Sequence, residues 1–253
     1  CIGNWEEEED SFLFFSRPAF EQVKSILSRQ PQLSYIDSYH MPYEQWLGEI
    51  FTTFEHGKFR VIPPWESSPD IKNTSGAKLS ILLDPGLVFG TGTHPTTRDC
   101  LEALEIAAGP NPFNTVLDLG TGTGLLALAA AKLGSSAVIA ADLNLLAART
   151  AHRNVHLNHM QNRIITVQGR AEDMISFPAD LLIANIHYDV MRQLVNDSGF
   201  FTKKNFILSG LLRSEAKGIV DVLARHQAKI IKQWTQEGLW QTIYGKIVQE
   251  GCL

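Results

Sequence analysis

A glycine-rich stretch in the middle of the chain has the composition and spacing of a ligand-binding turn. The segment DLGTGTG, residues 118–124, carries Gly120, Gly122 and Gly124 between an apolar run and a helical one. Glycine adopts positive φ without strain, and its lack of a Cβ atom lets backbone amides approach a ligand closely. We therefore expect the three glycines to line a cofactor site, although a tight strand-to-helix turn without a ligand has the same signature.

The spacing of these glycines bears on the class of cofactor. Nicotinamide-dependent oxidoreductases carry a Gly-x-Gly-x-x-Gly fingerprint, whereas here the third position after Gly122 is Leu125. The pattern therefore disfavours a nicotinamide cofactor.

Two polar residues follow later apolar runs. Asp142 lies 22 residues after Gly120. A carboxylate at this place can accept hydrogen bonds from both hydroxyls of a ribose. An acid there can also cap a helix. Asn185 ends the fourth run, and in a doubly wound sheet the crevice opens where strand order reverses, here between strands one and four. Gly120 and Asn185 should thus face each other. The Asn185 amide could accept from a substrate amine and donate to a cofactor, although an asparagine that only starts a turn fits too.

A second glycine-rich segment lies upstream. LDPGLVFGTGTHPTT, residues 83–97, has three glycines in seven residues, and Thr93 or His94 precedes Pro95 at an expected helix start. The helix over 95–108 buries one apolar face. We expect this loop to form a lid or floor for the site.

The order of apolar runs and helical stretches predicts the elements that hold these residues. Short β-branched runs alternate with helical patterns, as in a parallel sheet covered by helices. Two final runs joined only by Glu237-Gly238 predict an antiparallel hairpin. We therefore expect a Rossmann-like α/β fold with a seven-stranded, mostly parallel sheet. The expected strands are 115–119, 137–142, 163–169, 180–186, 205–210, 229–236 and 239–248, and the expected helices between them are 124–133, 145–158, 188–197 and 213–225.

The first part of the chain predicts a small α+β element. Residues 11–15 and 34–40 read as strands on either side of a helix over 18–28. A stretch rich in proline and polar residues follows, as in linkers. The expected division is an N-terminal domain over 1–61, a linker over 62–78 and a second domain over 79–253.

Composition limits the function further. The apolar fraction of 44% predicts a globular protein. The net charge of −5 comes from the five acids at 6–10, which leaves 22 acids against 22 Lys and Arg and gives no basic surface for nucleic acid. The longest apolar run, 125–131, is too short to span a membrane.

Three scattered cysteines indicate a reducing compartment, so we expect a cytoplasmic protein. Because the chain begins with Cys1, a fragment is the favoured reading and a lipoprotein cysteine the alternative.

Three histidines have the spacing of a helical metal site. His152, His156 and His159 share one predicted helix face. No carboxylate or cysteine beside them completes a ligand set, so we expect a solvated helix face and no metal.

Several segments together resemble a known family. LDPGLVFGTGTHPTT, VLDLGTGTGLLALAAAKLG, AADLN, ANI, ILSG and EGLW occur in this order, and from about Ile2 to Gly245 the chain is similar to the PrmA family, which methylates the large-subunit ribosomal protein called L-eleven. The resemblance implies a class I, S-adenosylmethionine-dependent protein N-methyltransferase behind a small ferredoxin-like recognition domain. It also implies that this domain begins about one strand and one helix before Cys1, so we expect it to be truncated.

The resemblance carries site residues with it. By position, Thr97, Gly120, Asp142 and Asn185 are the cofactor contacts, and EGLW falls on the family's carboxyl-terminal hairpin. We take Asn185 as the group that orients a lysine or α-amine, and His94 as a weaker candidate for a proton relay. The protein substrate is expected to be L-eleven. This protein itself is expected to be a monomer. Two alternatives stay open: a nucleic-acid amino-methyltransferase, whose usual Asn-Pro-Pro-aromatic is here Asn-Ile-His-Tyr at 185–188, and a non-enzymatic cofactor-binding protein.

Overall fold

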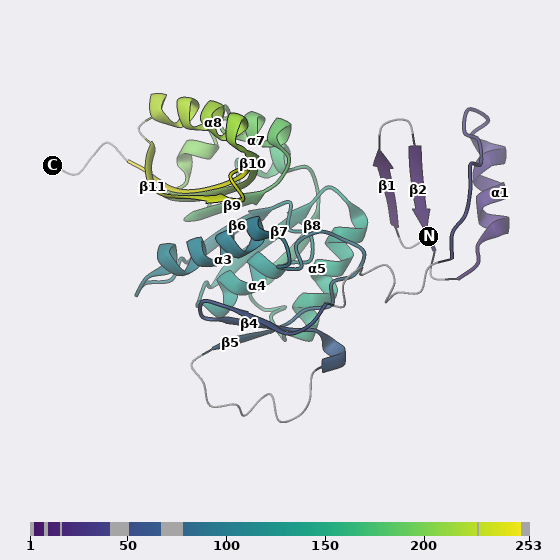
Figure 1. Ribbon diagram of the computed structural model, residues 1–253, viewed down its shortest axis with the longest axis horizontal. Helices are drawn as coiled ribbons and strands as arrows, with labels where there is room; N and C mark the ends of the chain where they lie inside the picture. The colour runs from purple at the N-terminus through teal and green to yellow at the C-terminus, as the bar shows by residue number, and fades with distance from the viewer. Residues whose placement is uncertain are drawn as a thin grey trace.

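A computed structural model describes residues 3–7, 10–15, 17–40, 51–66, 78–226 and 228–248 (Figure 1). Most of the expected linker, residues 67–77, lies outside the described residues. The described part contains three separate sheets, of two, seven and three strands.

The seven-stranded sheet confirms the expected Rossmann-like architecture. Its strand order is β11-β12-β10-β9-β6-β7-β8. The chain winds outward from β6 to β8 and then restarts at β9 beside β6, so the order reverses between β6 and β9. The strand β12 pairs antiparallel with both of its neighbours, as the hairpin pattern predicted. The strand bounds are β6 Thr115–Leu119, β7 Ala137–Asp142, β8 Ile164–Gln168, β9 Leu181–Asn185, β10 Asn205–Leu212, β11 Ala228–Gln236 and β12 Trp240–Ile247.

Helices cover both faces of this sheet (Figure 1). One face packs against α3, α4 and α5 in one apolar core, and the other packs against α6, α7 and α8 in a second. Most parallel strands are therefore buried on both sides, which is why their sequences are apolar runs without alternation. The helix bounds are α3 Pro95–Ala108, α4 Leu125–Lys132, α5 Leu145–Leu157, α6 Ala171–Met174, α7 Tyr188–Leu194 and α8 Arg213–Arg225; the 3₁₀ helices are η1 Pro64–Glu66 and η3 Phe200–Thr202.

A three-stranded sheet, which the sequence pattern did not reveal, lies below α4 in Figure 1. It consists of β3 Phe54–His56, β4 Phe59–Ile62 and β5 Leu79–Leu82. The strand β4 pairs with β5 in parallel, and Phe59 and Val61 are buried in the same core as α3 and α4. We therefore propose that the domain containing the large sheet begins at or before Phe51, rather than at residue 79.

The described residues before position 41 form a two-stranded sheet and one helix. The strands β1 Gly3–Glu7 and β2 Asp10–Phe14 pair antiparallel, and α1 Phe20–Arg29 follows, close to the expected strand and helix. The strand expected over 34–40 is wrong, because residues 33–40 have no regular secondary structure. Ile36 and Tyr39 in that stretch are 74% and 82% exposed, so its apolar residues do not form a buried strand face.

Candidate functional site

The glycine-rich turn joins the end of β6 to the start of α4, at the point where the strand order reverses. Gly120, Gly122 and Gly124 have φ of +72°, +56° and +83°, so each needs the conformational freedom of glycine. Atoms of the protein itself lie close to these glycines. A Cβ on Gly120 would lie 2.1 Å from Cγ2 of Ile186, and one on Gly122 would lie 2.3 Å from the carbonyl oxygen of Phe89. Packing alone therefore requires these glycines, and their contact with a cofactor stays a proposal.

Asp142 stands at the end of β7 beside this turn. Its Oδ2 accepts from the Gly122 amide at 2.9 Å, and its Oδ1 accepts from the Asn144 amide at 2.9 Å. Burial raises the pKa of the carboxyl group, and the two amides partly offset that effect. Each oxygen keeps a lone pair for a further donor, as a ribose diol would require. The cap of α5 is instead Asn144, whose Oδ1 accepts from the Leu146 amide at 2.8 Å.

Asn185, at the end of β9, belongs to a chain of three polar side chains. Its Nδ2 lies 3.5 Å from Oγ1 of Thr96, which lies 2.7 Å from Nδ1 of His94. That Nδ1 also accepts from the Thr96 amide at 3.3 Å and so caps α3. Because Nδ1 is an acceptor, the Thr96 hydroxyl donates to it and accepts from Asn185. Burial lowers the pKa of His94, which favours the neutral ring that this arrangement needs.

The long contact with Thr96 points Nδ2 of Asn185 toward the start of α3. With Nδ2 bound to Thr96, Oδ1 faces the other way and accepts no hydrogen bond from the described residues. Gly210 on β10 has a φ of +82°, and a Cβ atom on it would lie 3.0 Å from Oδ1 of Asn185. Because Gly210 has no side chain, the space beside this Oδ1 stays open. The site therefore offers an oriented, unused acceptor at the reversal point of the sheet.

Thr97 is the second residue of this region with unused hydrogen-bonding capacity. It lies in the first turn of α3, is only 1% exposed, and its Oγ1 has no hydrogen-bond partner among the described residues. A buried hydroxyl without a partner costs roughly 1–3 kcal/mol. A polar ligand that reaches the hydroxyl would remove this cost, so Thr97 fits the cofactor contact that the resemblance assigns to it.

Replacing Thr97 by valine tests that role. We expect Thr97→Val to weaken binding of S-adenosylhomocysteine roughly fivefold to tenfold, because one hydrogen bond is lost, without lowering the free energy of unfolding. Calorimetric titration and urea denaturation measure the two quantities. Thr150→Val is the matched control, since the Thr150 hydroxyl is also buried without a partner but belongs to α5. Equal cofactor affinity in Thr97→Val and the unaltered protein would remove Thr97 from the site.

The expected lid or floor is bound tightly to the glycine turn. The carbonyl of Phe89 accepts from the Thr123 amide at 3.0 Å, and the carbonyl of Gly90 accepts from the Thr123 hydroxyl at 2.6 Å. Asn154, fully buried on α5, donates to the carbonyls of both Asp84 and Thr123 at 2.8 Å. Segment 84–94 is therefore held in place as a fixed wall of the site. Asn154 was not predicted as a site residue, because in the sequence it is only one of several polar residues on the buried side of its helix.

The carboxyl-terminal hairpin anchors α3. Asp99 accepts from Gln236 at 2.7 Å and lies 3.4 Å from the Thr242 hydroxyl, and burial raises the pKa of its carboxyl group. Trp240 packs edge-on against His94, with ring centroids 5.0 Å apart. The EGLW motif therefore lies at the rim of the site, next to the cap of α3.

The three histidines do not form a metal site. His152 and His156 pack against each other on α5, while His159 lies beyond the end of that helix. Within the described ranges, no group of three His, Cys, Asp or Glu could hold a metal ion.

Asp118 is a buried acid directly below the glycine turn. Burial raises its pKa to about 7, the nearby Asp142 adds to the shift, and a hydrogen bond from Thr121 opposes it. Because the folded pKa exceeds the unfolded value of 3.8, folding is favoured by this group at low pH and less so as the pH rises through 7. The pH window for this loss lies between about 4 and 7.

We therefore expect Asp118→Asn to remove a pH-dependent part of the stability. Between pH 5 and 8, the unaltered protein should lose about 2–4 kcal/mol of unfolding free energy relative to the variant. Urea denaturation at several pH values measures the difference, with the exposed Asp221→Asn as control. Parallel pH profiles for Asp118→Asn and the unaltered protein would contradict the buried, protonatable acid.

The fold and site together define a class of protein. A seven-stranded sheet with one antiparallel strand, a glycine turn after the first central strand and an acid at the end of the next is the Rossmann-like fold of class I methyltransferases. The family model described as ribosomal protein L11 methyltransferase (PrmA) matches residues 27–247, and the chain belongs to this family.

Individual relatives agree with the family match. The chain is 37% identical over 184 residues to the ribosomal protein L11 methyltransferase of Geobacillus kaustophilus, which covers 70% of this chain and 57% of the relative. It is 39% identical over 173 residues to the enzyme of the same name from Bacillus cytotoxicus, which covers 66% and 53%. The chain thus spans about half the length of the curated relatives it matches.

Solved structures show the same fold. The crystal structure of ribosomal protein L11 methylase from Lactobacillus delbrueckii subsp. bulgaricus matches with a TM-score of 0.66 at 26% identity, and covers 78% of this chain and all of that one. A human methyltransferase 10 domain containing protein matches with a TM-score of 0.54 at 14% identity over 66% of this chain and 89% of that one, a likeness of fold alone.

Proposed function

We propose that this chain transfers a methyl group from S-adenosylmethionine to an amine of a protein, and that the protein is ribosomal protein L11. The observation that carries the proposal is the free Oδ1 of Asn185, held in one direction by Thr96 at the reversal point of the sheet. The names of the relatives support the choice of cofactor and substrate.

The residues that would hold the cofactor fit its chemistry. Asp142 keeps lone pairs for a ribose diol, and Thr97 has a buried hydroxyl without a partner. Gly120, Gly122 and Gly124 shape the turn between them. When bound, the cofactor supplies a methyl group already activated on a sulfonium, so the protein mainly needs to position an amine in line with it. We propose no metal for this step.

Asn185 would position that amine. Its Oδ1 can accept an N–H from a lysine side chain or an α-amine and thereby aim the nitrogen lone pair. A neutral amine is required, and a partly dry site lowers the pKa of an amine and favours that form. We keep His94 as a proposed site residue, but its Nδ1 already binds Thr96, so its geometry favours a role in fixing Thr96 and Asn185 over direct proton transfer.

Location and assembly are proposed on related grounds. We keep the monomer as a proposal. Along the described segments no helix is long and apolar enough to cross a membrane. The scattered cysteines, of which Cys100 is a buried free thiol, support the cytoplasm as the compartment.

A labelling experiment separates the proposal from its alternatives. The protein is incubated with methyl-labelled S-adenosylmethionine and purified L11, and in parallel with a cell lysate treated with nuclease or protease. We expect label in L11 that survives nuclease and is lost with protease. Label lost with nuclease would favour the nucleic-acid enzyme, and bound cofactor without any transfer would favour a binding protein.

A further inference from the structure

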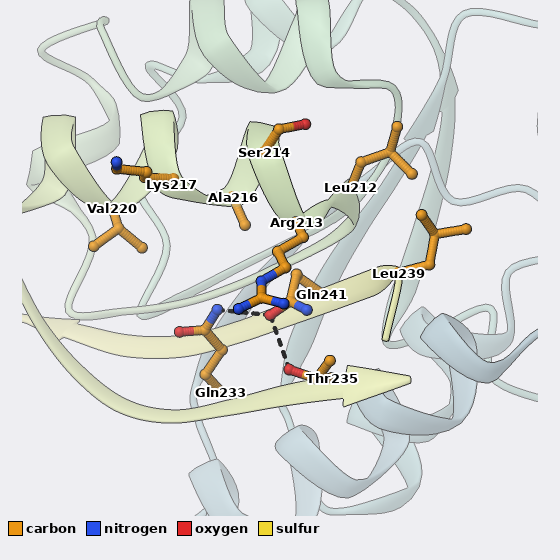
Figure 2. A pocket seen from close by; sticks show the side chains of 10 residues that line it. All are labelled: Leu212, Arg213, Ser214, Ala216, Lys217, Val220, Gln233, Thr235, Leu239 and Gln241. Atoms are coloured by element: carbon orange, nitrogen blue, oxygen red, sulfur yellow. Dashed lines mark hydrogen bonds between the residues drawn. The ribbon is translucent and has the colours of Figure 1, made fainter. Parts of the chain in front are cut away.

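A groove lies on the far face of the sheet from α3, between α8 and the hairpin of β11 and β12 (Figure 2). Its volume is about 1070 Å³. Side chains from the first turns of α8 form one wall, and side chains from the two strands form the other. The residues that the argument uses are Leu212, Arg213, Lys217, Val220, Leu239 and Gln241.

The groove contains hydrogen-bond donors that are unpaired among the described residues. Arg213 and Lys217 are exposed and form no ion pair or side-chain hydrogen bond with any described residue, and no acid is among the lining residues. Gln241, only 3% exposed, forms the floor, and its Oε1 accepts from Gln233 at 2.8 Å and from Thr235 at 3.1 Å. Its Nε2 has no partner in the described part of the chain. Figure 2 shows the Arg213 guanidinium reaching over this floor.

These groups indicate the charge of a ligand. Two cations without partners and an unused amide N–H all call for acceptors, and carboxylates supply acceptors with the complementary charge. The same groove is flanked by Leu212, Val220 and Leu239. Apolar walls suit the side chains of a polypeptide better than a sugar-phosphate backbone, which binds along a track of cations.

Two residues that line the groove are neighbours, in the chain and in the sheet, of residues at the proposed methyl-transfer site. Leu212 ends β10, two residues after Gly210, which lies against Asn185. Leu239 precedes Trp240, which packs on the ring of His94. Leu212 and Trp240 are also paired across β10 and β12. A chain whose amine reaches Asn185 could therefore continue into the groove.

We propose that this groove binds an acidic, partly apolar segment of the protein substrate while an amine of that substrate is methylated. Arg213 and Lys217 take its carboxylates, and Leu212, Val220 and Leu239 take its apolar side chains. The groove would thus select substrates by residues away from the modified amine. The identity of the occupant as the protein substrate rests on the proposed function. The preference of the groove for acidic ligands rests on its own residues.

Charge reversal at both cations tests the proposal in two independent assays. The first measures binding of a fluorescein-labelled peptide of alternating glutamate and leucine, by anisotropy, against a lysine–leucine peptide and a single-stranded RNA of similar length. The second measures KM and kcat with purified L11. The variant is Arg213→Glu with Lys217→Glu, and Lys229→Glu, an exposed lysine on β11 outside the groove, is the control. Binding of S-adenosylhomocysteine and the circular dichroism spectrum check that each variant is folded.

In the peptide assay we expect the glutamate peptide to bind better than the lysine peptide and the RNA, and its affinity to fall roughly tenfold or more in the double variant only. Added salt should weaken binding to the unaltered protein more than to the variant. Equal affinity for the three probes, RNA binding that the double variant abolishes, or a glutamate peptide unaffected by the reversal would each overturn the proposal.

In the kinetic assay we expect KM for L11 to rise roughly tenfold in the double variant with kcat changed by less than about twofold. An unchanged KM in an active enzyme would overturn the docking role and leave the proposed function standing. Failure of the unaltered protein to methylate L11 would instead refute the proposed substrate, and the peptide assay would still decide the charge preference of the groove.

Discussion

Replacing Asn185 by alanine is expected to lower kcat for methyl transfer by roughly tenfold or more and to leave the fold intact. The side chain is only partly buried, and the one hydrogen bond that it makes with the described residues, to Thr96, is long at 3.5 Å, so its removal should cost less than about 1 kcal/mol of stability. The lost Oδ1, by contrast, is the acceptor that we propose positions the substrate amine. Single-turnover kinetics with purified L11 measures the effect on the chemical step.

Two further variants separate orientation from contact. Thr96→Val keeps the Oδ1 acceptor but removes the hydroxyl that holds the amide, so we expect a smaller loss of kcat than in Asn185→Ala and nearly unchanged affinity for S-adenosylhomocysteine. Asn196→Ala removes an exposed asparagine on the opposite side of the sheet and should change neither quantity. Full turnover of L11 by Asn185→Ala would remove Asn185 from the mechanism.

The parts of the site that were predictable from sequence are those where the local backbone or the end of a strand calls for one type of residue. Glycines at positive φ mark the turn after β6, and an acid after an apolar run marks the end of β7. The alternation of strands and helices predicts a parallel sheet, since parallel strands require crossovers on the faces of a sheet. A doubly wound order then places the reversal between β6 and β9. These signals are local or depend only on the order of elements, so one sequence suffices to read them.

The parts that sequence did not reveal depend on contacts between distant segments. The orientation of Asn185 is set by Thr96, 89 residues earlier, and the pattern around Thr96 signals only a helix start. The strands of the three-stranded sheet are short, and β4 finds its parallel partner β5 across the linker. Conversely, residues 34–40 contain tyrosine and isoleucine, which favour strands, but they pair with no strand in the described structure, which is why a propensity-based prediction failed there.

Asn154 is the position where we expect the largest loss of stability. It is fully buried, and its side chain makes three hydrogen bonds of 2.8 Å: Oδ1 accepts from the Asp84 amide, and Nδ2 donates to the carbonyls of Asp84 and Thr123. Asn154→Ala removes all three at once and leaves a polar cavity under segment 84–94. Buried hydrogen bonds of this kind cost about 1–3 kcal/mol each when one partner is deleted, and partial relaxation suggests a total of about 3–5 kcal/mol.

Such a loss is a large part of the 5–15 kcal/mol that holds an ordinary domain together. Urea denaturation should therefore show a much lower midpoint for Asn154→Ala, whereas the exposed Asn196→Ala, which also loses an asparagine hydrogen bond, should differ from the unaltered protein by less than about 1 kcal/mol. Cofactor affinity should fall as well, because Asn154 joins the wall of the site to the glycine turn. A change of midpoint as small as that of the control would mean that water replaces the lost amide. The hydrogen bonds from Thr123 to Phe89 and Gly90 would then hold the wall without Asn154.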